Sequence, residues 1–105
     1  MIKSKIDKET MDSLFKAMLI NLQRTEMTTT LLQKQRMFDF INASVEQVED
    51  YGIRLNLEKS QDFNIVVWYS TWMWNSRSGN VPIPEGLQST MRNRRAKQIM
   101  RGESQ

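Results

Sequence analysis

The chain contains no cysteine and no histidine among its 105 residues. Without cysteine there is neither a disulfide framework nor a thiolate metal site, and without histidine the commonest zinc ligand and the usual general base are missing. No glycine-rich phosphate loop follows a strand pattern, and no nucleophile has a base beside it. We therefore expect no enzymatic activity, no metal and no cofactor.

Long hydrophobic runs are also lacking. Charged residues interrupt the apolar ones from Met1 to Asp7, so the sequence predicts neither a signal peptide nor a membrane span, and we expect synthesis in the cytosol with no membrane contact. A chain of this length has room for one domain with a moderate core. Burying surface against further copies of the chain would therefore add useful stability.

Charge is unevenly distributed along the chain. Residues 1–84 hold ten Lys/Arg and ten Asp/Glu, so the net charge of +3 comes from residues 85–105, with five Lys/Arg against two Asp/Glu. This pattern is typical of a solvated helix face, and equally of an electrostatic contact with nucleic acid or with an acidic partner. The sequence leaves both explanations open.

Hydrophobic periodicity predicts a first helix at about residues 8–22, with Asp7 as its N-cap. A second helix is predicted at about residues 28–51, with Thr28 as the N-cap and Met27 and Leu32 packed across it as a hydrophobic staple. Its end is marked by Gly52, which suits a left-handed residue, so Ile53 can contact Val48 as in a Schellman motif.

A third element is predicted at residues 62–77, and its part from residue 63 to residue 74 is ambiguous, because Ile65, Val66, Val67 and the aromatic residues after them favour strands. Twelve residues without turn punctuation are long for a strand, however, and Ser60 or Asp62 provides a helix start. We interpret the segment as a helix that is apolar nearly all round. Such a helix must be covered on several sides, by other helices or by another subunit.

Pro82 and Pro84 stiffen a loop before a last helix, which Gly102 can end. Leu87 and Met91 give this helix a short apolar anchor, so we expect its second half to leave the domain body. The predicted fold is therefore all-α, a small bundle of about four helices with an extended C-terminal helical arm. Residues 1–81 form the body, and residues 82–105 form a proline elbow and a basic arm.

Two groups of residues are candidates for binding. Trp68 and Trp72 share a helical face, whereas Trp74 lies roughly 200° from Trp72, so one surface can be core and the other an interface. The basic residues of the last helix can bind phosphates or the carboxylates of a protein partner, and they are Arg92, Arg94, Arg95, Lys97 and Arg101.

Three runs, Asp62–Arg77, Val81–Leu87 and Met91–Arg95, resemble the head-tail connector (adaptor) proteins of tailed bacteriophages. In that family an apolar, aromatic helix ends in an arginine and is followed by a loop with a proline step, a leucine and an Asn/Arg-rich last helix. Upstream, a short helix, a long helix and the Tyr-Gly-Ile-x-Leu closure at Tyr51–Leu55 occur in the same order.

The resemblance implies a virion protein of the phage neck, assembled in the host cytoplasm. Its copies would form a ring, twelvefold by the family pattern, beneath the portal protein, and the ring would carry genomic DNA through its channel without sequence preference. A tail-side connector or stopper protein would bind next. The basic residues of the arm would contact the portal or the DNA path, and the subunit interface would include Trp72, Trp74, Arg77, Pro82, Pro84 and Leu87.

Two other functions are consistent with the sequence. A small basic helical protein could be a DNA-binding regulator, although its arginines follow a stiff loop on a poorly amphipathic helix. An unrelated helical adaptor could use the basic arm on a host protein. Sequence-preferring DNA binding with a steep salt dependence would distinguish the regulator from the connector.

Overall fold

Four α-helices and one short 3₁₀-helix make up the part of the chain that the computed structural model describes, which is residues 6–77, 79 and 81–102. No strand occurs in these residues, so the predicted all-α bundle of about four helices is confirmed. The elements in order are α1 (Lys8–Asn21), η1 (Glu26–Thr28), α2 (Leu31–Tyr51), α3 (Ser60–Asn75) and α4 (Glu85–Met100).

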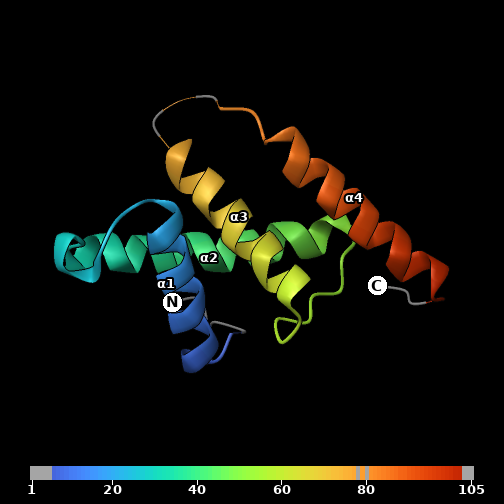
Figure 1. Ribbon diagram of the computed structural model, residues 1–105, viewed down its shortest axis with the longest axis horizontal. Helices are drawn as coiled ribbons and strands as arrows, with labels where there is room; N and C mark the ends of the chain where they lie inside the picture. Colours follow the sequence, from blue (N-terminus) through green and yellow to red (C-terminus); the bar gives the residue numbers. More distant parts are fainter. Residues whose placement is uncertain (1–5, 78, 80, 103–105) are drawn as a thin grey trace.

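Helix α3 lies at the centre of the bundle and packs against each of the other three helices. Figure 1 shows α2 running behind it, with α1 on one side and α4 on the other. The molecule measures 44 × 30 × 25 Å along its principal axes. This central position explains why the α3 sequence is apolar nearly all round, because most of its surface is covered by a neighbouring helix.

The helix starts follow capping chemistry. The Asp7 side chain accepts a hydrogen bond from the Thr10 backbone N–H (2.8 Å), so the predicted N-cap of α1 is confirmed. The predicted start of α2 is wrong, because its N-cap is Thr30, which forms a capping box with Gln33. Thr28 belongs instead to η1. Met27 is 98% exposed, so it does not pack in a hydrophobic staple.

The end of α2 is a Schellman motif, as predicted. Gly52 adopts φ 115°, its N–H donates to the Glu49 carbonyl (3.0 Å), and the Ile53 N–H donates to the Val48 carbonyl (3.4 Å). The left-handed backbone at Gly52 is one that side-chain-bearing residues rarely adopt. The motif turns the chain toward α3, and Ile53 is fully buried against α3 and α4.

Two apolar clusters form the core. The larger joins α1, α2 as far as Val45, and α3, and its buried residues are Met11, Leu14, Phe15, Met18, Leu19, Met37, Ile41, Val45, Val66, Val67 and Trp74. The smaller joins the end of α2, α3 and α4, and consists of Val48, Ile53, Ile65, Tyr69, Leu87 and Met91. Helix α4 therefore packs against the rest of the molecule through the smaller cluster and through polar contacts, and it takes no part in the larger cluster.

Candidate assembly surfaces

The inner face of α4 carries a buried ion pair with α3. Arg94 donates from Nε to Asp62 Oδ1 (2.7 Å) and from Nη2 to Asp62 Oδ2 (3.2 Å), which is a two-pronged contact. The two side chains are 9% and 1% exposed. A guanidinium and a carboxylate buried to this degree require each other, because either charge alone would be costly to desolvate.

Further hydrogen bonds tie this pair to the chain between α2 and α3. Arg94 Nη2 also donates to the Arg54 carbonyl (2.8 Å), and the Asn56 N–H donates to Asp62 Oδ2 (2.7 Å). Gln98, one turn further along α4, donates to the Gly52 carbonyl (2.9 Å) and accepts from the Arg54 N–H (2.7 Å). Among the described residues, every buried side-chain nitrogen and oxygen has a partner.

We refer to Asp62, Arg94 and Gln98 as the polar anchor. Because Gln98 is only 2% exposed, α4 stays on the body almost to its end, and the predicted departure of its second half is wrong. The prediction failed because Arg94 and Gln98 face inward at an i, i+4 spacing without being apolar. Arg94 is also buried within its own chain, so it is not available for the portal or DNA contact assigned to it.

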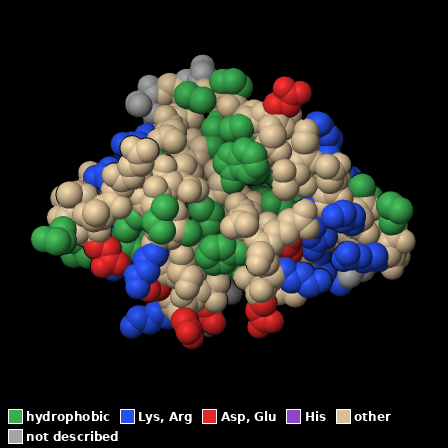
Figure 2. All heavy atoms as spheres, in the orientation of Figure 1, with side chains coloured by type: hydrophobic (Ala, Val, Ile, Leu, Met, Phe, Trp, Pro, Cys, Tyr) green, Lys and Arg blue, Asp and Glu red, His purple; other side chains and the backbone are tan. Residues whose placement is uncertain are grey.

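The other four predicted basic residues are exposed on α4 and just beyond it, and they are Arg92, Arg95, Lys97 and Arg101. Figure 2 shows Lys and Arg side chains gathered over the C-terminal half of α4. The Arg95 guanidinium lies 5.3 Å from the centre of the Tyr51 ring, and Arg92 donates to the Ser89 hydroxyl (3.1 Å). Two apolar side chains accompany them, Ile99 at 61% and Met100 at 85% exposure.

The three tryptophans of α3 occupy different surroundings. Trp74 is 4% exposed, packs edge-to-face on Phe40, and has the Arg77 guanidinium 4.0 Å from its ring centre. Trp72 is half-buried and donates from Nε1 to the carbonyls of Val81 (2.9 Å) and Pro82 (3.1 Å). Trp74 is thus a core residue, and Trp72 fixes the elbow between α3 and α4.

The remaining predicted interface residues are also divided between core and surface. Leu87 is fully buried in the smaller apolar cluster, so it offers no area to a neighbouring subunit. Arg77 and Pro82 are exposed and Pro84 is partly exposed, which leaves them accessible.

The aromatic residue that the site prediction omitted is Trp68, which is 39% exposed. Its ring lies against α4 at Gly86, where a Cβ atom would be 2.9 Å from Trp68 Cη2. Figure 2 shows hydrophobic side chains gathered over α3 on the side of the molecule that faces the viewer. Trp68 also borders a shallow hollow between α1 and α3 with Ala17 and Ile20. The i, i+4 spacing of Trp68 and Trp72 predicts that they share a helical face, but it does not predict which of the two indoles is exposed to solvent.

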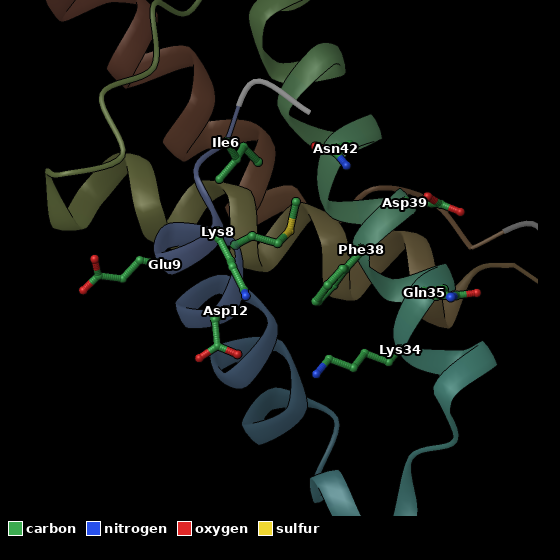
Figure 3. A pocket seen from close by; sticks show the side chains of 10 residues that line it. Ile6, Lys8, Glu9, Asp12, Lys34, Gln35, Phe38, Asp39 and Asn42 are labelled. Carbon is green, nitrogen blue, oxygen red and sulfur yellow. The ribbon is translucent and has the colours of Figure 1, made fainter. Parts of the chain in front are cut away.

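A groove of ≈ 1050 Å³ separates α1 from α2. Figure 3 shows Lys8, Lys34 and Phe38 between the two helices, with Glu9 and Asp39 on the outer sides. The Lys34 amine lies 5.2 Å from the centre of the Phe15 ring and 5.7 Å from that of Phe38. Charges of both signs line this groove, so it does not select a ligand of one charge.

A second groove of ≈ 580 Å³ lies among α2, α3 and α4, with Asp50 and Arg92 among the residues that line it. Tyr69 also lines it, and burial raises the pKa of this tyrosine above its ordinary value of 10.0, so its hydroxyl keeps its proton at neutral pH. Across the described ranges there is no group of three or more acidic residues arranged to hold a metal ion. None of the helices in those ranges is both long and apolar enough to cross a membrane.

The class of protein that the structure defines is a small all-α bundle with exposed basic residues around its last helix. Comparison with protein-family models, with curated proteins and with solved structures finds no match to this chain.

Proposed function

We propose that this chain is a structural head-to-tail connector subunit of a tailed phage, which forms a ring under the portal, continues the DNA channel and links capsid to tail. The observation that carries the proposal is the ordered series of features from the aromatic helix through the proline elbow to the basic last helix, which resembles the connector family. The proposed location is the neck of the virion, after assembly in the host cytoplasm.

The arrangement of surfaces supports this role. A closed ring uses one heterologous contact repeated around an axis, so each subunit needs two different surfaces that complement each other. This chain offers a partly apolar surface around Trp68 and separate exposed cations on α4. The exposed cations suit the carboxylates of a neighbouring subunit, those of the portal protein, or the phosphates of DNA in the channel.

The resemblance suggests twelve copies per ring, with the portal on one side and a further connector or stopper protein on the other. DNA that moves through such a channel must not be held by base-specific contacts. The cations of α4 can contact phosphates without reading a sequence, which is compatible with a channel. Because the same cations could bind DNA in a regulator, a DNA-binding regulator is the second candidate function.

Negative-stain microscopy and analytical ultracentrifugation of the purified chain, alone and with isolated portal rings of its own phage, test the proposal. We expect rings that stack coaxially on portals. A matched preparation with Arg92→Glu and Lys97→Glu keeps the polar anchor and should bind portals or neighbouring subunits less tightly. A chain that stays monomeric at every concentration and ignores portals would contradict the proposal, and tight binding to one duplex sequence would favour the regulator.

A further inference from the structure

Helix α3 presents a stripe without charge at the surface, in a chain of which 26% of the residues are charged. Asp62 is the single charged residue of this helix, and it is buried in the polar anchor. The exposed residues of α3 are therefore all neutral, and Gln61, Asn64 and Trp68 follow one another on one face at spacings of three and four residues. The centres of protein interfaces are depleted of charge in the same way and enriched in tryptophan.

The uncharged surface continues from α3 onto α1 across the hollow beside Trp68, which has a volume of ≈ 440 Å³ and which we call the neutral hollow. None of its lining residues is charged, and they are Ala17, Ile20, Asn21, Asn64, Val67 and Trp68. Within the described ranges the Trp68 indole N–H donates no hydrogen bond, whereas that of Trp72 has two acceptors. Figure 2 shows charged side chains mainly toward the edge of the molecule. An accessible indole with an unused donor, beside an uncharged hollow, is typical of a binding anchor.

A second uncharged surface lies at the start of α2. Residues 27–33 contain no charged residue, and their apolar side chains are open to solvent, with Met27 98%, Leu31 73% and Leu32 67% exposed. We refer to these three residues as the neutral tip. Figure 1 shows η1 and the first turn of α2 at one end of the molecule, beyond α1 and α3. Three apolar side chains exposed to this degree within six residues indicate an interaction site, unlike apolar residues that are scattered singly.

Hydrogen bonds hold the neutral tip in place, although η1 contributes no buried residue. Thr25 and Thr28 form a capping box at the start of η1, and Thr30 and Gln33 form a second one at the start of α2. Arg24 joins the two, because it donates to the Thr28 carbonyl (3.3 Å) and to Gln33 Oε1 (3.0 Å). The tip is therefore ordered before it meets a partner, which lowers the conformational entropy that binding costs.

We propose that the neutral tip of one copy docks in the neutral hollow beside Trp68 of the next copy, as the repeated contact of the ring. This inference rests on the proposed function, because a closed ring needs two different, complementary surfaces on each subunit, and the chain supplies one of each kind. The tip protrudes, the hollow recedes, and neither brings a charge that would be desolvated without a partner. The hydroxyl oxygens of Thr28 and Thr30, beside the tip, can accept a hydrogen bond from the Trp68 indole.

Complementary variants test the contact. One carries Leu31→Glu and Leu32→Glu in the tip, and the other carries Ile20→Lys and Asn64→Lys in the hollow. All four positions are exposed and Trp68 is left unchanged, so both variants should keep the circular dichroism spectrum of the parent chain. Each variant alone should associate on the order of a hundredfold more weakly, because it places two charges in an uncharged contact.

Mixing the two variants in equal amounts should restore assembly. In a ring where they alternate, each tip with glutamates meets a hollow with lysines, and each unchanged tip meets an unchanged hollow. The restored rings should be more sensitive to salt than those of the parent chain, since half of their contacts hold opposite charges. The control, Gln47→Glu with Ala96→Glu, changes the net charge as much as the tip variant at exposed positions outside both surfaces, and it should assemble like the parent chain. Native mass spectrometry and sedimentation, at low and at high salt, measure association.

The outcomes separate this inference from the proposed function. If the parent chain forms rings that neither variant weakens, or if mixing the weakened variants restores nothing, the contact between tip and hollow is wrong and the connector role stands. If mixing restores only open filaments, the contact stands and the closed ring is wrong. If the tip variant still forms rings but loses its binding to portals, the tip serves the portal and the inference is overturned. A parent chain that stays monomeric and ignores portals overturns both.

Discussion

The two halves of this bundle are held together by different means. Helices α1, α2 and α3 enclose a large apolar cluster, whereas α4 is joined to α3 by a small apolar cluster and by the polar anchor of Asp62, Arg94 and Gln98. Apolar burial is tolerant of geometry, but a two-pronged ion pair fixes both the position and the rotation of α4. The exposed basic residues of α4 are therefore held in fixed positions relative to the body of the bundle.

The largest effect is expected in the apolar half. Phe15 is fully buried and packs edge-to-face on Phe38, with ring centres 5.4 Å apart. Phe15→Ala should lower the free energy of unfolding by about 3–5 kcal/mol, because it leaves a cavity. Urea denaturation followed by circular dichroism measures this, with the exposed Gln35→Ala as the control. If the free energy of unfolding fell by less than about 1 kcal/mol, the larger apolar cluster of α1, α2 and α3 would contribute less to stability than we infer.

A smaller and more local effect is expected at the polar anchor. Arg94→Met should cost about 3 kcal/mol, because it leaves the Asp62 carboxylate buried without its cation. Hydrogen exchange should then speed up in α4 before it does in α1 to α3. The double variant Asp62→Asn with Arg94→Met should recover most of the loss, since no buried charge remains. Uniform acceleration in all four helices would contradict the division into two halves.

The effect of Gly86→Ala on stability should change sign when the Trp68 ring beside it is removed. Gly86→Ala normally stabilises a helix by about 1 kcal/mol, but here the new Cβ would lie 2.9 Å from the Trp68 ring. We expect Gly86→Ala to destabilise the parent chain by about 1 kcal/mol, as over-packing does. In a Trp68→Ala background the same change should be stabilising. Thermal melts of the four variants give both values, and equal signs in the two backgrounds would exclude the contact.

The apolar half was largely predictable from the sequence, and the α4 half was not. Helical periodicity located the buried faces of α1 and α2, and Gly52 with Ile53 marked the end of α2. Arg94 and Gln98 gave no such signal, because they are buried through specific partners 32 to 46 residues away in the chain. Their burial depends on a tertiary arrangement that hydrophobic patterns do not encode.

The site residues follow the same division. The exposed cations of α4 could be named from charge, but charge alone could not separate Arg94 from Arg95. Arg94 shares the helical face of Leu87 and Met91, whereas Arg95 points about 100° away from it. Trp74 was assigned to an interface and lies in the core, whereas Trp68 is the exposed indole. Two residues of the same type at nearby positions can differ in burial, because different neighbouring residues cover them.

The smallest effect is expected from pH at the start of α1, in the apolar half. Hydrogen bonding to Thr10, through its side chain and then through its backbone N–H, holds the pKa of Asp7 below its ordinary value of 3.8, so the folded chain binds this proton less readily than the unfolded chain. The stabilisation is complete above 3.8 and is lost as the pH falls through the lowered pKa. Asp7→Asn keeps a capping oxygen but cannot titrate there. Between about pH 5 and pH 2 the melting temperature of the parent chain should therefore fall slightly more than that of Asp7→Asn, and parallel curves would show that this carboxylate does not stabilise α1.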